Sequence, residues 1–203
     1  MRAAKRGAAL LSAASALKLG FFPSTLDIAW DLDGTLITHK HGVEADAQHV
    51  YAGSRGAYSL YCRPHAATVL RLLSFLGNRQ VLFTAATQGY ADSILDALLP
   101  GLLPQRLYRD SLTVSKSHGK DLLRVVSLLG GELGRTILVD DQGRNKVEEQ
   151  NFVFCRKWEY GENGDMELLR VAAVVVFCNL VGPQAALALL RDALAAPPTA
   201  RLR

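Results

Sequence analysis

Residues 26–36, with the sequence LDIAWDLDGTL, decide how the rest of the chain is interpreted. They consist of an apolar strand, an acidic turn and the tripeptide Gly-Thr-Leu. Asp31 and Asp33 are separated by one residue where the strand ends, and Gly34 allows a sharp turn. One such carboxylate can attack a phosphorus atom while the other gives a proton to the leaving oxygen and later takes one from water. The stretch therefore predicts a catalytic pair of carboxylates.

Strands and helices alternate along the rest of the chain. Apolar positions recur at helical spacing after Pro64, and Gly77 can end that helix. The same reasoning predicts strands at 80–84, 106–108 and 136–139, and helices at 88–99 and 121–129. This alternation is typical of an α/β fold with a doubly wound parallel sheet covered on both faces. We expect residues 38–61 to form a hairpin or loop over the carboxyl edge of the sheet, where ligands bind in such folds.

Further polar side chains stand at the ends of these predicted elements. Thr84 ends one strand, Lys120 opens a helix, and Asp140 with Asp141 ends the strand at 136–139. A hydroxyl and an ammonium group can hold phosphoryl oxygens, and two adjacent carboxylates are hard oxygen ligands suited to Mg²⁺. Together with the first acidic pair, they predict a site for phosphate and Mg²⁺ at one edge of the sheet.

These residues resemble the haloacid dehalogenase superfamily, whose signature DxDGT appears at 31–35. The resemblance extends to the branch that contains the RNA polymerase II C-terminal-domain phosphatases and the phosphatase-like receptor subunit of the mitochondrial inner-membrane translocase. Stretches similar to that branch cover most of the chain: YCRP at 61–64, FTAATQ at 83–88, YAD at 90–92, RLYRD at 106–110, KDL at 120–122, VDD at 139–141 and DMELL at 165–169.

The resemblance implies a HAD-like Rossmannoid domain without a large cap domain, acting as a Mg²⁺-dependent phosphatase through an aspartyl phosphate. It implies that Asp31 is the nucleophile and Asp33 the acid and base, while Thr84 and Lys120 bind phosphoryl oxygens. The implied metal site involves four residues: Asp31, Asp33 through its carbonyl, Asp141 and the nearby Asp140. In two places the chain departs from the branch, which usually has Glu at the position of Gly34 and Ser-Pro at 142–143.

Two classes of function stay open at this point. The first is a phosphatase acting on a phosphoserine or phosphothreonine side chain of a protein. The missing cap domain favours such a substrate over a small metabolite. The second is a catalytically weak or inactive subunit that keeps the fold as a structural or binding component of a large mitochondrial complex, since fold and function are separate questions.

The composition excludes several other classes of protein. The chain has 203 residues, of which 49% are hydrophobic and 21% charged, as in an ordinary globular domain. A mean hydropathy of +0.11 is too low for a polytopic membrane protein. The three scattered cysteines lack CxxC spacing, which argues against a disulfide framework or a zinc ribbon. Much of the net charge of +4 lies at the chain ends, which indicates an acidic partner rather than a nucleic-acid-binding face.

The two ends carry predictions of their own, outside a phosphatase-type domain at 24–195. Residues 1–23 are basic and contain no acidic side chain, as in a mitochondrial or plastid transit peptide, although a retained docking arm is the alternative. We expect mitochondrial residence, or otherwise a cytosolic or nuclear protein. Residues 171–190 carry no charge, but Gly182 and Pro183 interrupt them, which favours soluble helices over a membrane span. Residues 196–203 are predicted to be an irregular tail.

Other polar residues receive plainer interpretations. The histidines of the polar segment lack cysteine neighbours and are predicted to be solvated rather than to bind a metal: His39, His41 and His49. Arg63 and Arg109 either guide the phosphate or form structural ion pairs, and we favour ion pairs.

Overall fold

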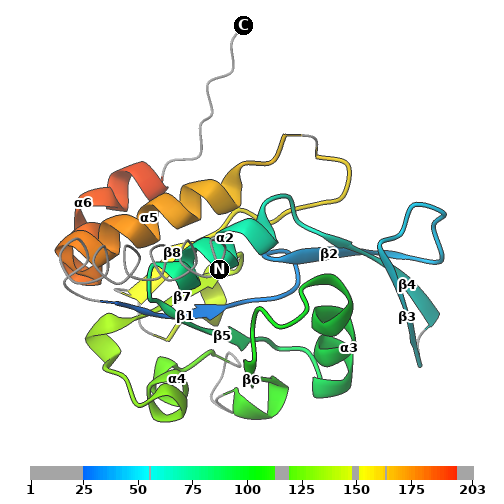
Figure 1. The fold of residues 1–203 in the computed structure, drawn as a ribbon, viewed down its shortest axis with the longest axis horizontal. Helices are drawn as coiled ribbons and strands as arrows, with labels where there is room; N and C mark the ends of the chain where they lie inside the picture. The colour runs from blue at the N-terminus through cyan, green and yellow to red at the C-terminus, as the bar shows by residue number, and fades with distance from the viewer. Residues whose placement is uncertain (1–24, 55, 113–118, 148–150, 163, 196–203) are drawn as a thin grey trace, which may run out of the picture.

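The fold rests on a parallel sheet, as the alternation of strands and helices predicts. The computed structural model describes residues 25–54, 56–112, 119–147, 151–162 and 164–195, so the predictions for 1–23 and 196–203 lie outside the described residues. Five parallel strands lie in the order β6-β5-β1-β7-β8 (Figure 1). Their bounds are β1 (Asp27–Trp30), β5 (Arg79–Phe83), β6 (Gln105–Leu107), β7 (Thr136–Asp140) and β8 (Phe152–Phe154).

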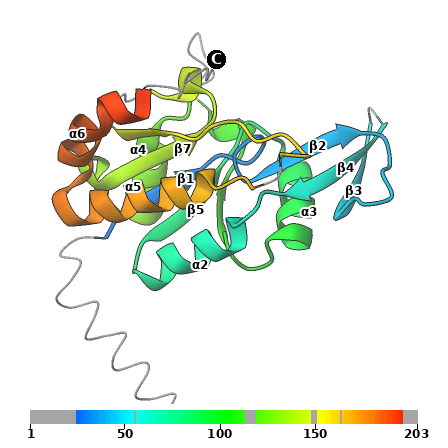
Figure 2. The same ribbon diagram turned by 90° about the horizontal axis from the view of Figure 1, so that it is seen from above.

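Helices cover both faces of this sheet, because successive side chains of each strand point to opposite sides. Ile28 and Trp30 of β1 belong to the larger core, which receives buried side chains from α2 (Ala66–Phe75), α3 (Gln88–Leu98), α5 (Glu167–Val181) and α6 (Pro183–Ala195). Ala29 faces the smaller core under α4 (Leu122–Leu129). Figure 2 shows α2 and α5 together on the face of the sheet that carries the larger core. The predicted α/β fold, doubly wound around a parallel sheet, is thus confirmed.

The ends of the helices follow the expected local signals. The Asp121 carboxylate accepts a hydrogen bond from the backbone N–H of Leu123 at 2.9 Å and so caps α4 at its first turn. Gly130 ends α4 in the left-handed conformation, with φ of 65°. The predicted strands and helices all occur within one or two residues of their expected bounds. The short edge strand β8 was not predicted.

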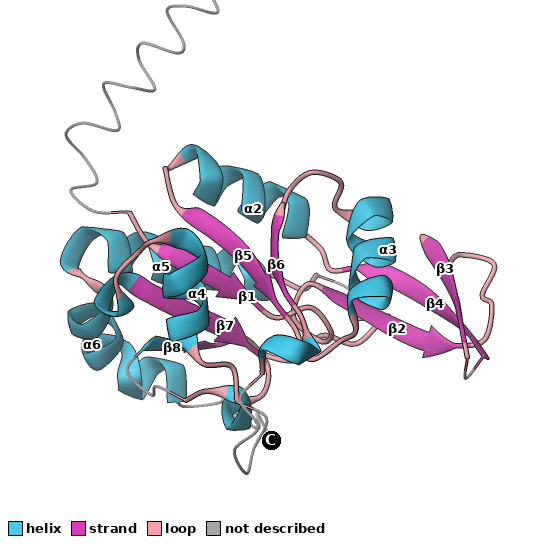
Figure 3. Ribbon diagram, turned by 90° about the horizontal axis from the view of Figure 1, so that it is seen from below, coloured by secondary structure: helices cyan, strands magenta, loops and turns pink. Residues whose placement is uncertain are grey.

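A second, antiparallel sheet fills the segment that interrupts the alternation. Its strands β2 (Ile37–His41), β3 (His49–Gly53) and β4 (Gly56–Cys62) lie in the order β2-β4-β3. The predicted hairpin is the pair β3-β4, and β2 extends it to three strands. Figure 3 shows this sheet beside α3, with which β3 and β4 are in contact.

The uncharged stretch near the C-terminus forms two helices rather than one. Gly182, with φ of 87°, separates α5 from α6, and the two helices pack against each other. Throughout the described part of the chain, every helix is too short or too polar to span a bilayer.

A buried ion pair joins the segment between β4 and α2 to the segment before α5. Arg63 donates from Nε to Asp165 Oδ1 at 3.0 Å and from Nη2 to Asp165 Oδ2 at 2.8 Å, and both side chains are 0% exposed. Its third nitrogen, Nη1, reaches the carbonyl oxygen of Thr35 at 3.2 Å and the sulfur of Cys155 at 3.3 Å. The favoured interpretation of Arg63 as part of a structural ion pair is therefore confirmed.

We predict that Asp165→Asn lowers the free energy of unfolding by about 3–5 kcal/mol at neutral pH, because it leaves the Arg63 guanidinium buried without a counter-ion. Burial opposes ionisation of Asp165, but the Arg63 guanidinium outweighs it and holds the pKa of this carboxyl below its ordinary value. A carboxyl with a lowered pKa contributes stability above its unfolded pKa and loses it as pH falls through the folded pKa.

The measurement is urea unfolding as a function of pH, from neutral to about pH 3. The wild type should lose stability below about pH 4, near the ordinary carboxyl pKa, and the variant should lose less over the same range. If the free energy of unfolding fell equally with pH for both proteins, the stabilising role given to the Arg63–Asp165 pair would be contradicted.

Candidate active site

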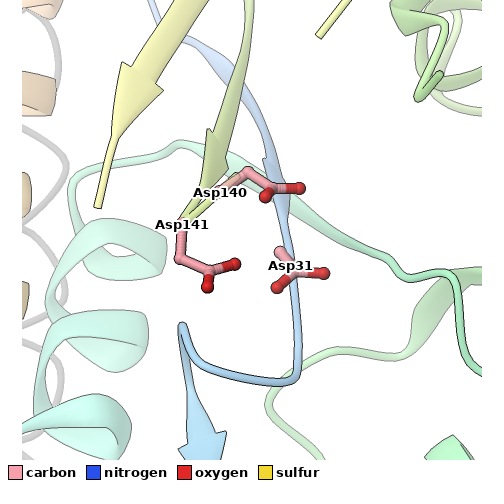
Figure 4. Close-up of side chains that lie close together, drawn as sticks. All are labelled: Asp31, Asp140 and Asp141. Carbon is pink, nitrogen blue, oxygen red and sulfur yellow. The ribbon is translucent and has the colours of Figure 1, made fainter. Parts of the chain in front are cut away.

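Three carboxylates meet at the carboxyl edge of the central sheet. Asp31 follows β1, and its backbone N–H donates to the Val139 carbonyl oxygen of β7 at 2.9 Å. Asp140 is the last residue of β7, and Asp141 comes next. Figure 4 shows the three side chains around one space, and an oxygen from each lies within 4.8 Å of the others. The parallel strands thus bring together residues more than a hundred positions apart.

Lys120 lies between two of these carboxylates. Its ammonium group donates to Asp31 Oδ1 at 2.5 Å and to Asp140 Oδ2 at 2.6 Å. The Lys120 side chain is 1% exposed and that of Asp140 is 0% exposed. Because charges this deeply buried are costly unless they are paired, the two carboxylates and the ammonium depend on one another.

The pKa values of these groups reflect their burial and their neighbours. Burial raises the pKa of Asp31 to about 7, and Asp140 adds to this effect while Lys120 opposes it. For Lys120, burial disfavours the charged form, but Asp31 and Asp140 outweigh burial and raise the pKa of the ammonium. Lys120 therefore stays charged beneath the site.

Asp140 is held in place by the loop that follows it. Its Oδ1 accepts from the backbone N–H of Gln142 at 2.7 Å and from Asn145 Nδ2 at 3.0 Å. The Asn145 carbonyl oxygen accepts from the backbone N–H of Lys120 at 2.7 Å. Asn145 thus joins the two buried charges, a role that sequence reasoning missed because a lone Asn in a loop carries no distinctive signal.

The structure supports a divalent cation beside Asp141. Its Oδ1 is buried and has no hydrogen-bond partner, and burial followed by the charge of Asp140 raises the pKa of this carboxyl. Carboxylate oxygens at this spacing are the donors that Mg²⁺ prefers. Bound Mg²⁺ would give the unpartnered oxygen a partner and relieve the repulsion, so the residues present fit the ion. Asp31, Asp140 and Asp141 would contribute their side chains.

Asp33 does not point its carboxylate into that cluster. Its Oδ1 accepts a hydrogen bond from the Tyr90 hydroxyl at 2.8 Å and lies 3.7 Å from His39 Nδ1. The neighbouring carboxylate raises the pKa of the His39 imidazole. The side chain of Asp33 therefore stands apart from the three clustered carboxylates, and its roles as acid and base and as a metal ligand through its carbonyl stay predictions.

Thr84 lies at the end of β5, as expected, and is almost wholly buried. Its backbone N–H donates to the Leu107 carbonyl oxygen at 3.0 Å, and its hydroxyl oxygen accepts from the backbone N–H of Ala86 at 3.1 Å. The hydroxyl hydrogen is thus left for another acceptor.

An open cavity of about 1030 Å³ lies over Asp31, Asp33 and Thr84, while Lys120 and Asp140 lie beneath its floor. A second cavity of about 410 Å³ borders Asp33 and Asp141. The predicted site residues therefore gather at one place, but only some of them face the larger space.

The remaining polar residues of the sequence analysis take varied positions. The rings of His39 and His41 contact Tyr58, and His49 Nε2 lies 3.5 Å from Ser93 Oγ. Arg109 lines the larger cavity and donates from Nε to the Ala85 carbonyl oxygen at 2.8 Å. It forms no ion pair with any described residue, and the choice for Arg109 between a phosphate guide and a structural ion pair stays a prediction.

Both the backbone conformation and the close contacts at position 34 require a glycine there. Its φ is 86°, and a Cβ atom there would lie 2.7 Å from Asp141 Oδ2. We predict that Gly34→Ala lowers the free energy of unfolding by at least about 1–2 kcal/mol, from the strain of a positive φ with an added displacement of Asp141.

Gly143→Ala is the matched control, because no atom lies within 4 Å of its added Cβ and its φ is not positive. Both variants are compared with the wild type by urea unfolding. A Gly34→Ala protein as stable as Gly143→Ala would show that this turn tolerates a side chain.

Known structures share this architecture. A fission yeast RNA polymerase II CTD phosphatase, an Fcp1 variant bound to beryllium fluoride, is 20% identical, with a TM-score of 0.53 over 93% of this chain and 58% of that chain. A second structure, of Fcp1 described as an essential RNA polymerase II CTD phosphatase, is 19% identical, with a TM-score of 0.54 over 95% of this chain and 58% of that chain. At such identities the likeness shows the fold alone, and this chain spans less than two thirds of either structure.

No curated protein sequence matches the chain significantly. The family model for NLI interacting factor-like phosphatases matches residues 27–181, which run from β1 to the end of α5 and include every residue of the site. The chain therefore belongs to the NLI interacting factor-like phosphatase family, a branch of the HAD superfamily.

Proposed function

We propose that this domain is a Mg²⁺-dependent phosphatase that acts through an aspartyl phosphate on phosphoserine or phosphothreonine side chains of proteins. The observation that carries the proposal is the buried Lys120, which holds Asp31 at the floor of an open cavity while Asp33 stands beside it. A nucleophile and a separate acid and base within one cavity are what two-step phosphoryl transfer requires.

The two carboxylates divide the reaction between them. One oxygen of Asp31 is engaged by Lys120, which leaves the other to attack phosphorus. Asp33 gives a proton to the departing serine or threonine oxygen, and in the second step it accepts a proton from the water that attacks the aspartyl phosphate. The Tyr90 hydroxyl fixes one Asp33 oxygen, so the other can face the leaving group.

Neutral and cationic donors surround the position of the phosphoryl group. An ammonium has three N–H donors, and Lys120 uses two of them on Asp31 and Asp140, so the third can reach a phosphoryl oxygen. The Thr84 hydroxyl can donate from the end of β5. Mg²⁺ held by the acidic cluster would neutralise carboxylates and polarise a phosphoryl oxygen.

The shape of the site favours a side chain on a protein over a small metabolite. The cavity is open to solvent, and the three-stranded sheet β2-β4-β3 borders it on one side without enclosing it. In the described part of the chain, no helical or sheet domain covers the opening. A side chain of an extended peptide can reach the floor while its backbone stays outside.

We predict that Mg²⁺ at about ten times its dissociation constant raises the thermal midpoint of the wild type by roughly 3–6 °C, because binding to the native state alone stabilises it. Asp141→Ala should reduce this rise without lowering the midpoint in EDTA, since the substitution also removes repulsion between carboxylates. Asp110→Ala, at an exposed position outside both cavities, is the control. A midpoint insensitive to millimolar Mg²⁺ would indicate a site that no longer binds the ion.

We also predict that Asp31→Asn abolishes Mg²⁺-dependent hydrolysis of p-nitrophenyl phosphate and trapping of beryllium fluoride, because an amide is a poor nucleophile. Circular dichroism of the variant shows whether the fold is kept. A folded wild type without Mg²⁺-dependent turnover over a broad pH range would refute the enzyme and favour a binding or structural subunit.

A further inference from the structure

The cavity over Asp31 has two chemically different walls. Tyrosines from β3, β4 and α3 form one wall, and among them Tyr51 and Tyr90 pack edge to face with centroids 5.1 Å apart. Arg109 and Arg144, from the segments that follow β6 and β7, line the same cavity. One wall is therefore aromatic, and a separate part of the rim is cationic.

Both arginines are anchored through the same nitrogen. Arg109 donates from Nε to the Ala85 carbonyl oxygen at 2.8 Å, and Arg144 donates from Nε to Gln142 Oε1 at 2.9 Å. Within the described part of the chain, the two terminal nitrogens of each guanidinium stay available for a ligand, and such a pair matches the two oxygens of a carboxylate or phosphate.

Neither arginine has a carboxylate partner among the described residues. Five other arginines are paired with acidic side chains: Arg63, Arg79, Arg106, Arg156 and Arg170. Among the described residues, Arg71, Arg124 and Arg135 also lack a carboxylate partner, but they line neither cavity. The two cavity arginines are thus exposed positive charges beside the position of an anionic substrate. Lys120 and Thr84 already serve the reacting phosphoryl group at the floor, so the rim is left to bind something else.

We infer that Arg109 and Arg144 bind a second anionic group of the substrate, and that Arg144 makes this domain selective for phosphopeptides with a carboxylate or a further phosphate near the phosphorylated residue. The inference rests on the proposed function and deepens it. A cavity of about 1030 Å³ has room for more than one residue, so a neighbouring side chain can reach the rim while the phosphoryl group lies on Asp31.

The backbone around Arg144 is fixed relative to the reacting atoms. The residues on its two sides both bond to Asp140: Gln142 through its backbone N–H at 2.7 Å and Asn145 through Nδ2 at 3.0 Å. Gln142 stands where the resembled branch usually has Ser, and in this chain its side chain holds the Arg144 guanidinium. The departure from the branch at this loop thus supplies the anchor for a residue that can determine specificity.

The test compares phosphoserine peptides that differ in one neighbouring residue. A glutamate, a phosphoserine or an alanine is placed at each of the three positions on either side, and kcat/KM is measured for every peptide. We expect acidic neighbours at the favoured position to raise kcat/KM on the order of tenfold over alanine in the wild type, as for hydrogen bonds to charged groups. Arg144→Gln should bring this ratio close to one. Arg144→Lys should retain part of it, because lysine keeps the positive charge but lacks the paired N–H donors of a guanidinium.

Arg71→Gln is the matched control, since Arg71 is exposed on α2 and lines neither cavity. It should leave every ratio as in the wild type. If Arg144→Gln lowers kcat/KM equally for all peptides and for p-nitrophenyl phosphate, the arginine guides the reacting phosphate and the inference is wrong. A wild-type ratio near one for every peptide also overturns it.

Two further measurements separate this inference from the proposed function. If p-nitrophenyl phosphate is not hydrolysed, the phosphatase proposal fails, and the same ratio is then taken from peptide dissociation constants measured by fluorescence anisotropy. A preference for acidic peptides that depends on Arg144 would uphold the anion site without turnover. Tighter binding of a single-stranded oligonucleotide than of any acidic peptide, lost in Arg144→Gln, would instead assign the arginines to nucleic acid.

Discussion

A buried ammonium group shared by two carboxylates is the interaction on which the site depends. Lys120 joins the end of β1 to the end of β7, and its backbone is tied to the loop after β7 through Asn145. Removing Lys120 would leave two buried carboxylates without their shared counter-ion, at a cost of about 3–5 kcal/mol in comparable proteins. Asp31, the proposed nucleophile, is therefore oriented by the same contacts that hold the sheet edge together, before any substrate arrives.

A second buried cation fixes the loop that carries Asp33. Arg63 comes from the segment between β4 and α2, and its guanidinium reaches the Thr35 carbonyl oxygen and Asp165 together. The backbone N–H of Trp158 donates to the Gly34 carbonyl oxygen at 2.8 Å and holds the loop from the other side. Because these partners come from distant parts of the chain, the turn that bears Asp33, the proposed acid and base, forms only when the domain is complete.

The strands, the helices and the edge at which the site forms follow from the sequence because each rests on a local pattern and a rule of topology. An apolar strand that ends in Asp31, and another that ends in Asp140, must meet when both are central in a parallel sheet. The side-chain direction of Asp33 does not follow, because it is set by Tyr90 on α3. The strand β8 could not be predicted because its three residues are too few to show a periodicity. It forms as an edge strand through its pairing with β7.

The charges of the site separate its chemistry from its choice of substrate. Asp31 and Asp140 share the single ammonium of Lys120, and Asp33 and Asp141 add further carboxyl groups nearby, so a phosphate dianion is repelled unless more positive charge is supplied. A divalent ion bound by Asp31, Asp140 and Asp141 would supply it at the floor and act equally on every phosphate ester. Charge fixed at the rim, on Arg109 and Arg144, acts only on the groups that surround the ester. In the proposed reaction, a change at the rim would therefore alter the preferred substrate without altering the carboxylates at the floor.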